Sequence, residues 1–228
     1  MRSTKDNLEI LFEDNHIVIV NKKSGDIVQA DKTGDNPLSE VVKEYIKEKY
    51  NKPGKVFLGV VHRLDRPTSG IIIFARTSKA LERLNKMLRD REISKTYWAV
   101  IKNNPKKTTG TLIHFLKKNP KNNKSTVFKK EAKGSKKAIL HYKTIKNLEN
   151  YSLLEINLET GRHHQIRAQL SFIGSPIKGD LKYGASRSNK DGGIHLHARK
   201  ICFVHPVSKE NISLVAPIPN EVIWNACK

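Results

Sequence analysis

The chain has 228 residues, enough for one good-sized domain or two small ones, and its formal net charge of +21 comes from 43 Lys and Arg against 22 Asp and Glu. This excess favours a polyanionic partner, above all nucleic acid, with an anionic membrane surface as the alternative. No apolar run approaches the ~20 residues of a spanning helix, and residues 1–16 lack a signal-peptide core. Cys202 and Cys227 lie far apart without metal-ligand spacing. These features predict a reduced, cytoplasmic protein.

The first part of the chain alternates short apolar runs with turn signals. Residues 8–12 alternate apolar and polar, which predicts a half-buried strand, and residues 17–20 form a second apolar run. Asn36 followed by Pro37 predicts a helix start, with Asn36 as the capping side chain and proline at the first helical position. Lysines occupy one face of this helix. That face is either a solvated surface or one that contacts RNA.

Residues 62–70, HRLDRPTSG, separate two apolar runs. The second run, residues 71–75, is continuous and β-branched, which is the pattern of a strand buried on both faces. A proline and a glycine punctuate the segment, so it is expected to be a loop of fixed shape, and such loops between rigid strands often carry catalytic groups. Asp65 stands between two arginines. Its structural reading is that it caps a turn and pairs with Arg63 or Arg66.

Further elements follow this loop. Thr77 or Ser78 can cap a second helix, whose apolar positions are Ala80, Leu81, Leu84 and Leu88. Residues 95–101 are rich in β-formers and predict a strand in which Tyr97 shares a face with other apolar residues. The order strand, loop, strand, helix predicts an α+β fold with a mixed sheet and helices packed against it.

Residues 102–137 are the least regular part of the sequence, rich in Lys, Asn and Thr with three short apolar islands. Within them, residues 117–126 predict a polar loop or hairpin tip that either contacts an RNA backbone or is a surface loop. Residues 138–145 and 151–158 then predict two strands joined by an Asn-rich turn.

Residues 159–184 form a second distinctive segment. Residues 163–172 carry apolar side chains at helical spacing, and Arg167 can project from this helix toward a neighbouring loop. The adjacent His163 and His164 invite a metal-binding interpretation. Neighbours on a helix diverge by about 100°, however, so no metal site is predicted.

Together these segments resemble the signature of the RluA-type family of RNA pseudouridine synthases. That family combines HRLD, TSG and a hydrophobic strand with TGR-x-HQ-I/L-R and a later Gly-Asp before a Tyr, and the chain supplies the second pattern as Thr160, Gly161, Arg162, His164, Gln165, Ile166, Arg167, Gly179, Asp180 and Tyr183. The resemblance spans roughly residues 8–217. The chain departs from the family pattern at three positions: Lys23 stands where the family usually has Pro, and Gln169 and Ser175 stand where it commonly has His.

The resemblance implies a pseudouridine synthase fold, in which a mixed, mostly antiparallel central sheet is flanked by helices and loops and carries a central RNA-binding cleft. It also implies one catalytic domain over residues 1–228, without the extra N-terminal RNA-binding domain of some relatives. The implied activity is isomerisation of specific uridines in structured ribosomal or transfer RNA. No cofactor and no metal are expected, RNA is the expected partner, and a monomer is the default expectation.

Four residues receive roles from the resemblance. Asp65 is implied to be the catalytic nucleophile, and Arg167 is implied to pair with it, which keeps the carboxylate charged and aimed. Tyr97 is implied to line the active site, where an aromatic face and a hydroxyl suit a base flipped out of the RNA. Arg63 is implied to handle substrate, because its planar guanidinium can stack where the base was.

Two other functions are weighed against this one. A non-catalytic RNA-binding protein on the same fold is disfavoured because Asp65, Tyr97 and Arg167 are all present, and pure binding needs no carboxylate. A hydrolase using Asp65 with His62 or His164 is disfavoured because no second catalytic carboxylate and no activated Ser or Cys is evident.

Overall fold

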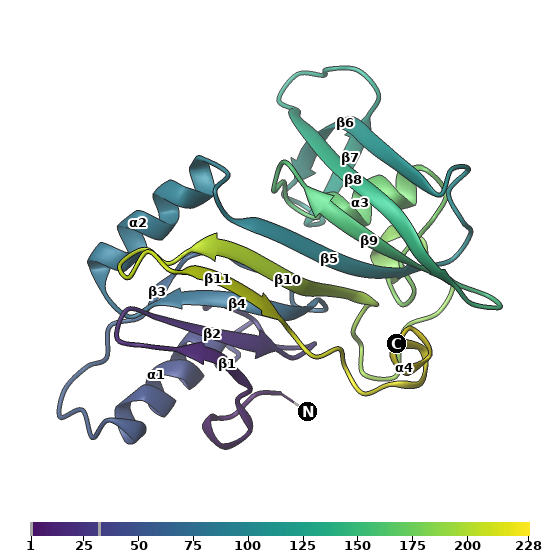
Figure 1. Cartoon of the computed structure of the whole chain (residues 1–228). Coiled ribbons are helices and arrows are strands. Elements are labelled where there is room, and N and C mark those ends of the chain that lie inside the picture. The colour runs from purple at the N-terminus through teal and green to yellow at the C-terminus, as the bar shows by residue number, and fades with distance from the viewer. Residues whose placement is uncertain (1, 32) are drawn as a thin grey trace. The chain divides into compact units, whose positions relative to one another are not determined.

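The structure is a computed structural model that describes residues 2–31 and 33–228. The backbone divides into two compact units: unit 1 comprises Met1–Ser94 and Ala198–Pro219, and unit 2 comprises Lys95–His197 and Asn220–Lys228. The strands of each unit pair mostly antiparallel and are accompanied by a few helices, which confirms the predicted α+β class (Figure 1). Over the described residues, every helix is too short or too polar to traverse a bilayer.

In unit 1, β1, β2, β4 and β10 are neighbours in that order, while β3 pairs with β4 and β11 with β10. Their bounds are Ile10–Glu13 for β1, Ile17–Lys22 for β2, Gly59–Val60 for β3, Ser69–Ala75 for β4, Leu196–Val204 for β10 and Asn211–Val215 for β11. The strand predicted from residue 8 begins at Ile10, because Lys5–Asn7 form a short 3-10 turn, η1, before it.

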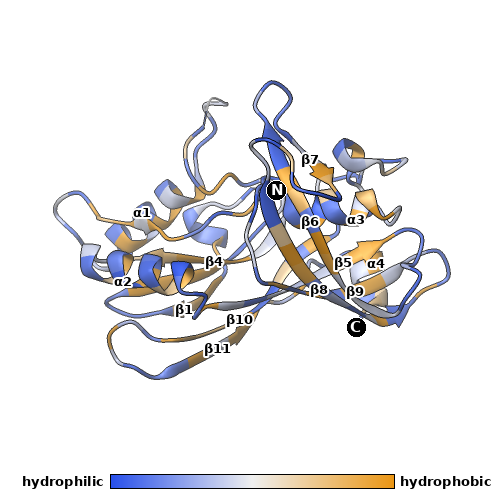
Figure 2. Cartoon of the chain, turned by 90° about the horizontal axis from the view of Figure 1, so that it is seen from above, coloured by the Kyte–Doolittle hydropathy of each residue, from blue (hydrophilic) through white to orange (hydrophobic). Residues whose placement is uncertain are grey.

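Helices α1 (Leu38–Lys49) and α2 (Ser78–Arg89) bury the two faces of the unit 1 sheet. One core contains Val18, Val20, Ile72 and Phe74 together with apolar residues of α1. The other contains Ile17, Ile19, Ile71 and Ile73 together with apolar residues of α2. Because side chains alternate along a strand, β4 is buried on both sides, as its continuous apolar run predicted. Figure 2 shows apolar and polar residues alternating around both helices.

The predicted cap is confirmed for α2 but not for α1. Thr77 caps α2 as predicted, because its Oγ1 accepts the backbone N–H of Ala80 at 3.2 Å. The predicted cap of α1 is wrong: Pro37 itself occupies the N-cap position, in extended conformation, and no side chain caps the helix. The helix therefore begins at Leu38, one residue later than the predicted start at Pro37.

In unit 2, the strands follow the order β5, β9, β8, β6, β7, and each neighbouring pair is antiparallel. Their bounds are Ser94–Ile101 for β5, Thr109–Asn119 for β6, Lys124–Phe128 for β7, Lys136–Asn147 for β8 and Ser152–Leu158 for β9. The two strands predicted around the Asn-rich turn are confirmed as β8 and β9.

The segment predicted to be irregular contains a regular hairpin, β6–β7. Lys117 lies opposite Thr126 in its register, so residues 117–126 are the hairpin tip, one of the two readings the sequence allowed. The strands were missed because only alternate positions are buried: His114 and Leu116 face inward, whereas the residues between and beyond them are polar or partly exposed. Such half-buried strands carry a weak apolar signal.

Helix α3 (Gln165–Phe172) packs against the unit 2 sheet, where its Ala168 contacts the cluster of Leu116, Ala138 and Tyr183. It begins later than the predicted residue 163, because His164 adopts a left-handed φ of 52° that no α-helix contains. The remaining elements are the 3-10 turn η2 (Leu181–Tyr183) and the short helix α4 (Val222–Ala226).

Candidate active site

The loop that carries Asp65 connects β3 to β4 within unit 1. The N–H of Thr68 donates to the carbonyl oxygen of Asp65 at 3.0 Å, which closes a turn. The Asp65 side chain is half-buried and Arg63 is exposed. Arg66 forms an ion pair with Asp35. The loop therefore presents Asp65 and Arg63 from a backbone of defined shape.

A second segment of unit 1, just after β2, anchors this loop through its carbonyl groups. The Arg66 carbonyl accepts from Lys22 Nζ at 3.1 Å and from the Gly25 N–H at 2.9 Å. The Pro67 carbonyl accepts from Ser24 Oγ at 3.1 Å. These bonds fix the backbone immediately beyond Asp65.

Lys22 is almost wholly buried, with 1% of its surface exposed. Its Nζ donates to the carbonyl oxygens of Lys23 and Arg66 at 2.9 and 3.1 Å. Burial lowers the pKa of Lys22 to about 7, and the charges of Asp26 and Asp65 oppose that lowering. The buried amine of Lys22 thus contacts the backbone of the Asp65 loop and interacts electrostatically with Asp65.

Arg167 lies on α3 in unit 2, with 5% of its surface exposed. Its Nε and Nη2 donate to the two carboxylate oxygens of Asp180 at 2.7 and 2.8 Å. This fork-to-fork geometry is the strongest form of ion pair available to an arginine. Asp180 belongs to the second family motif, but the sequence alone predicts no role for it.

Tyr97 lies on β5 of unit 2, opposite Ile156 of β9, and is 7% exposed. It shares its face of the strand with buried Ala99 and Ile101, as the alternation predicted. The structure therefore places Asp65 and Arg63 on one loop of unit 1, and Tyr97 and Arg167 in the interior of unit 2. The pairing of Arg167 with Asp65 stays a prediction.

The histidines of the two motifs have structural contacts. His62 Nε2 accepts the N–H of Ile73 at 3.2 Å. The argument that His163 and His164 diverge on a helix is wrong, because both precede α3 and their rings stack with centroids 3.8 Å apart. In residues 2–31 and 33–228, no three His, Cys, Asp or Glu side chains are grouped as metal ligands.

The three departures from the resembled pattern lie in ordered positions. Lys23 donates to the Asn7 side chain at 2.9 Å. Gln169 is fully buried, and its amide nitrogen lies 3.0 Å from His114 Nδ1. The backbone N–H of Ser175 donates to the Leu170 carbonyl at 3.0 Å just after α3.

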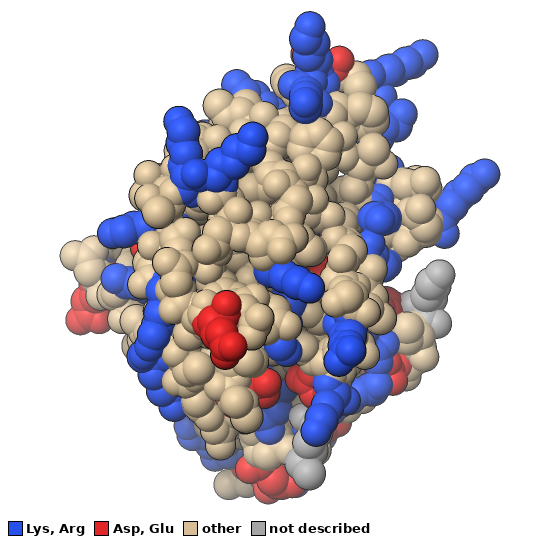
Figure 3. All heavy atoms as spheres, turned by 90° about the vertical axis from the view of Figure 1, so that its right-hand side faces the viewer, with Lys and Arg blue, Asp and Glu red and all other residues tan. Residues whose placement is uncertain are grey.

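Residues 102–137 hold twelve lysines and one acidic residue, Glu131. Within the described part of the chain, none of these lysines forms an ion pair. Figure 3 shows one face of the molecule, where lysine and arginine side chains project at many places and most of the acidic side chains lie in the lower half of the view. An unneutralised basic surface of this kind suits phosphate groups.

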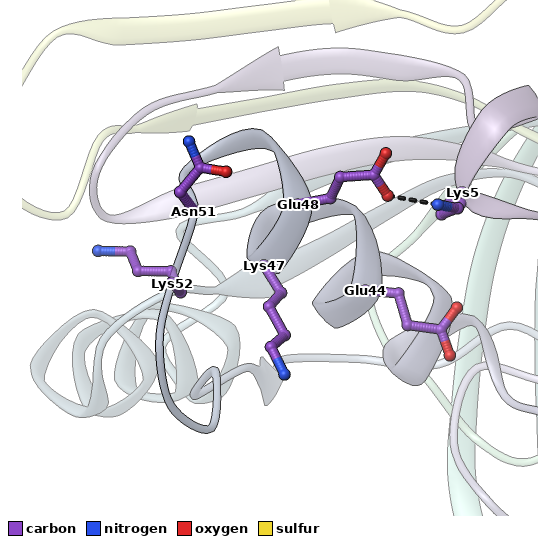
Figure 4. Close-up of a pocket in the computed structure, with 6 residues that line it drawn as sticks. All are labelled: Lys5, Glu44, Lys47, Glu48, Asn51 and Lys52. Carbon is purple, nitrogen blue, oxygen red and sulfur yellow. Dashed lines mark hydrogen bonds and ion pairs between the residues drawn. The ribbon is translucent and has the colours of Figure 1, made fainter.

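A surface depression beside α1 has a different character. It is lined by Lys5, Glu44, Lys47, Glu48, Asn51 and Lys52 (Figure 4). Lys5 pairs with Glu48, and on the same helix Lys43 pairs with Glu40 and Lys49 with Glu13. This balance of charges favours the solvated-surface interpretation of α1 over RNA contact.

Three residues near the candidate catalytic groups were not assigned roles from the sequence: Lys22, Asp180 and Tyr183. Lys22 ends the apolar run of β2, where a charged residue with 1% exposure is unusual. The sequence signal that could have identified Lys22 is its position directly after this run and shortly before Ser24 and Gly25. For Asp180 and Tyr183, the only signal in the sequence was their place in the family motif.

Comparisons with known proteins agree on one family. The profile described as RNA pseudouridylate synthase matches residues 16–172. The ribosomal large subunit pseudouridine synthase D of Zymomonas mobilis is 33% identical over 94% of this chain and 70% of its own length. The ribosomal large subunit pseudouridine synthase C of Buchnera aphidicola is 36% identical over 93% of this chain and 67% of its own length. An uncharacterized RNA pseudouridine synthase of Synechocystis is 32% identical over 93% of this chain, which spans 66% of that relative.

Solved structures show the same fold. Human RNA pseudouridylate synthase domain containing 4 superposes with a TM-score of 0.77 at 24% identity, covering 93% of this chain and 89% of its own. Human RNA pseudouridylate synthase domain containing 1 superposes with a TM-score of 0.75 at 21% identity, covering 100% of this chain and 90% of its own. The predicted pseudouridine synthase fold is thereby confirmed. The chain belongs to the RNA pseudouridylate synthase family, the isomerases that convert uridine in RNA to pseudouridine.

Proposed function

We propose that this chain isomerises specific uridines in structured RNA with Asp65 as its nucleophile. The family profile carries the proposal, since it covers residues 16–172 and therefore includes Asp65, Tyr97 and Arg167. The reaction breaks the bond from C1′ to uracil N1 and forms a bond from C1′ to C5. A proton leaves C5 and N1 gains one, so electrons balance without an oxidant. The chemistry therefore requires no redox cofactor and no external energy source.

Asp65 and Arg167 are proposed to form the catalytic ion pair. A carboxylate can attack a carbon of the nucleotide only while ionised, and a nearby guanidinium favours that state. Asp180 engages Nε and Nη2 of Arg167. A guanidinium has five N–H donors, so Arg167 can serve a second carboxylate while Asp180 holds it in place.

The target uridine is proposed to flip out of the RNA before it reacts. Extrusion costs a few kcal/mol, which contacts in the pocket partly recover. Tyr97 is proposed to contact the flipped base with its ring and hydroxyl. The exposed guanidinium of Arg63 is proposed to stack where the base was.

The RNA is proposed to be ribosomal, because two of the relatives are named for the ribosomal large subunit; transfer RNA stays an alternative. The lysines of residues 117–137 are proposed to contact its phosphates. We further propose that the two units make up one catalytic domain over residues 1–228 that acts as a monomer, without a metal. Both cysteines are free thiols, which accords with the proposed cytoplasmic location.

The test is to incubate ribosomal and transfer RNA lacking the modification with the protein and to map pseudouridine at single-nucleotide resolution. We expect a small number of modified uridines, unchanged by a chelator on RNA that folds without divalent ions. RNA that is bound but unmodified by wild-type protein would instead support the non-catalytic alternative. Cleaved RNA or released base would support a hydrolase.

A further inference from the structure

Tyr183 of η2 joins the β6–β7 hairpin to the region of Arg167 within unit 2. Its side chain is buried, with 3% exposed. Its hydroxyl accepts the backbone N–H of Ser125 on β7 at 2.7 Å. The neighbouring Lys182 reaches the hairpin turn, where its Nζ lies 3.4 and 3.3 Å from the carbonyl oxygens of Asn122 and Asn123. The short turn η2 thus contacts both the strand and the tip of the lysine-rich hairpin.

The ring of Tyr183 also supports Arg167. The guanidinium carbon of Arg167 lies 5.1 Å from the ring centroid, within the range of a cation–π contact, and such contacts strengthen when desolvated. Asp180 fixes the edge of the same guanidinium through two hydrogen bonds. The ring and the carboxylate come from one short segment, so together they define both the tilt and the in-plane direction of the guanidinium.

A third contact links Tyr183 to the start of α3. Its hydroxyl shares a hydrogen bond of 3.0 Å with His164 Nδ1. His164 holds the left-handed conformation from which α3 begins. Ser125 Oγ donates to the carbonyl oxygen of the adjacent His163 at 2.7 Å. Burial raises the pKa of the Tyr183 hydroxyl, so the group keeps its proton and can donate one hydrogen bond as well as accept one.

We infer that Tyr183 is a positioning residue, which orients Arg167 through its ring and ties that arginine to the RNA-contacting hairpin through its hydroxyl. The inference rests on the proposed roles of Arg167 and of the hairpin lysines. Its physical basis is that a catalytic group displaced by about 1 Å can lose ~10²-fold in rate. The ring and the hydroxyl have separate contacts, so their contributions can be separated by substitution.

Two variants of Tyr183 separate these contributions, and Tyr142 provides matched controls. Tyr142 is also a buried tyrosine of the unit 2 sheet, 8% exposed, and its hydroxyl donates to the Lys107 carbonyl. Tyr183→Phe removes only the hydroxyl, whereas Tyr183→Leu removes the ring as well. Tyr142→Phe and Tyr142→Leu make the same chemical changes elsewhere. Thermal melts of all four variants measure the general loss of stability.

Steady-state kinetics on the modified RNA give the first readout. For Tyr183→Leu we expect kcat to fall ~100-fold. For Tyr183→Phe we expect kcat to be retained and KM to rise severalfold, because the hairpin loses its tie while the ring remains. Equal kcat values for Tyr183→Leu and Tyr142→Leu at equal melting temperature would overturn the inference. So would an unchanged KM for Tyr183→Phe.

An NMR readout does not depend on activity. In ¹⁵N-arginine-labelled protein, the Arg167 Nε–H signal is assigned by its loss in Arg167→Met. We expect that signal to shift or broaden in Tyr183→Leu and to persist in Tyr183→Phe. An unaltered signal in Tyr183→Leu overturns the positioning role. If wild-type protein forms no pseudouridine, the proposed function is wrong. The NMR result then still decides whether Tyr183 orients Arg167, because it does not depend on activity.

Discussion

Arg167 and Asp180 form a bidentate ion pair whose side chains are 6% and 1% exposed. The two residues are thirteen positions apart, one on α3 and one just before η2. A charge buried this deeply is tolerated because its partner satisfies it with good geometry. The ion pair therefore orients the arginine that we propose to act on Asp65.

Asp180→Asn is predicted to destabilise the protein by ~3–5 kcal/mol, because it leaves the buried guanidinium of Arg167 without its charged partner. Denaturant unfolding monitored by circular dichroism measures the change. Glu149→Gln, which removes an exposed carboxylate from the same unit, is the control and should stay within about 0.5 kcal/mol of wild type. A loss as small as that of the control would show that the ion pair contributes no net stability.

The proposed pair between Arg167 and Asp65 is tested by a double-mutant cycle. Arg167→Met should abolish activity and lower stability. Adding Asp65→Asn should recover part of the stability and none of the activity, since the unpaired carboxylate has been removed. The same cycle with Asp180→Asn gives the coupling to the structural partner. Simple additivity in the Asp65 cycle would mean that Arg167 serves Asp180 alone, and another cation would have to be sought for Asp65.

Asp65→Asn is predicted to abolish isomerisation while RNA affinity stays within severalfold of wild type. The substitution removes the charge at nearly constant shape, so the loop anchored through the Arg66 and Pro67 carbonyls should keep its conformation. Single-turnover assays on saturating RNA, with filter binding on the same RNA, measure the two quantities separately. Substantial turnover by this variant would show that Asp65 is not the nucleophile.

RNA binding is predicted to weaken steeply with salt, and the lysine-rich hairpin should account for part of that slope. Each lysine that contacts a phosphate adds about 0.7–0.9 to the slope of log K against log salt. The triple variant Lys117, Lys118 and Lys121→Gln should therefore reduce the slope by about 2–3 if all three make contact. Lys47, Lys52 and Lys55→Gln, on exposed positions of unit 1, is the control of equal charge. Equal slopes for the two variants would assign the effect to net charge rather than to the hairpin.

Lys22 is predicted to make stability depend on pH. Its pKa is about 7 in the folded chain against an ordinary 10.5, so between these values the unfolded chain binds the proton and the folded chain does not. The free energy of unfolding should therefore rise with pH across this window. Relative to Lys22→Met, wild type should gain roughly 2–3 kcal/mol between about pH 6.5 and pH 9.5. A difference independent of pH would mean that the amine stays protonated, held by Asp26 and Asp65.

The sequence by itself determined the elements whose signal is local. The continuous run of β4 predicted a strand buried on both faces, and Thr77 predicted the cap of α2. The motif around Asp65 and that around Arg167 are enough to indicate the family. Periodicity encodes burial, and capping residues act on their own helix, so neither depends on the rest of the chain.

The partners of buried polar groups were decided only by the tertiary structure. Nothing local predicts that Asp180 accepts from both Nε and Nη2 of Arg167, or that Tyr183 accepts the N–H of Ser125, fifty-eight residues away. The left-handed turn at His164, which moved the start of α3, is likewise held by a contact with Tyr183. A buried donor or acceptor must find a partner wherever packing places one, and that choice depends on the whole unit rather than on sequence neighbours.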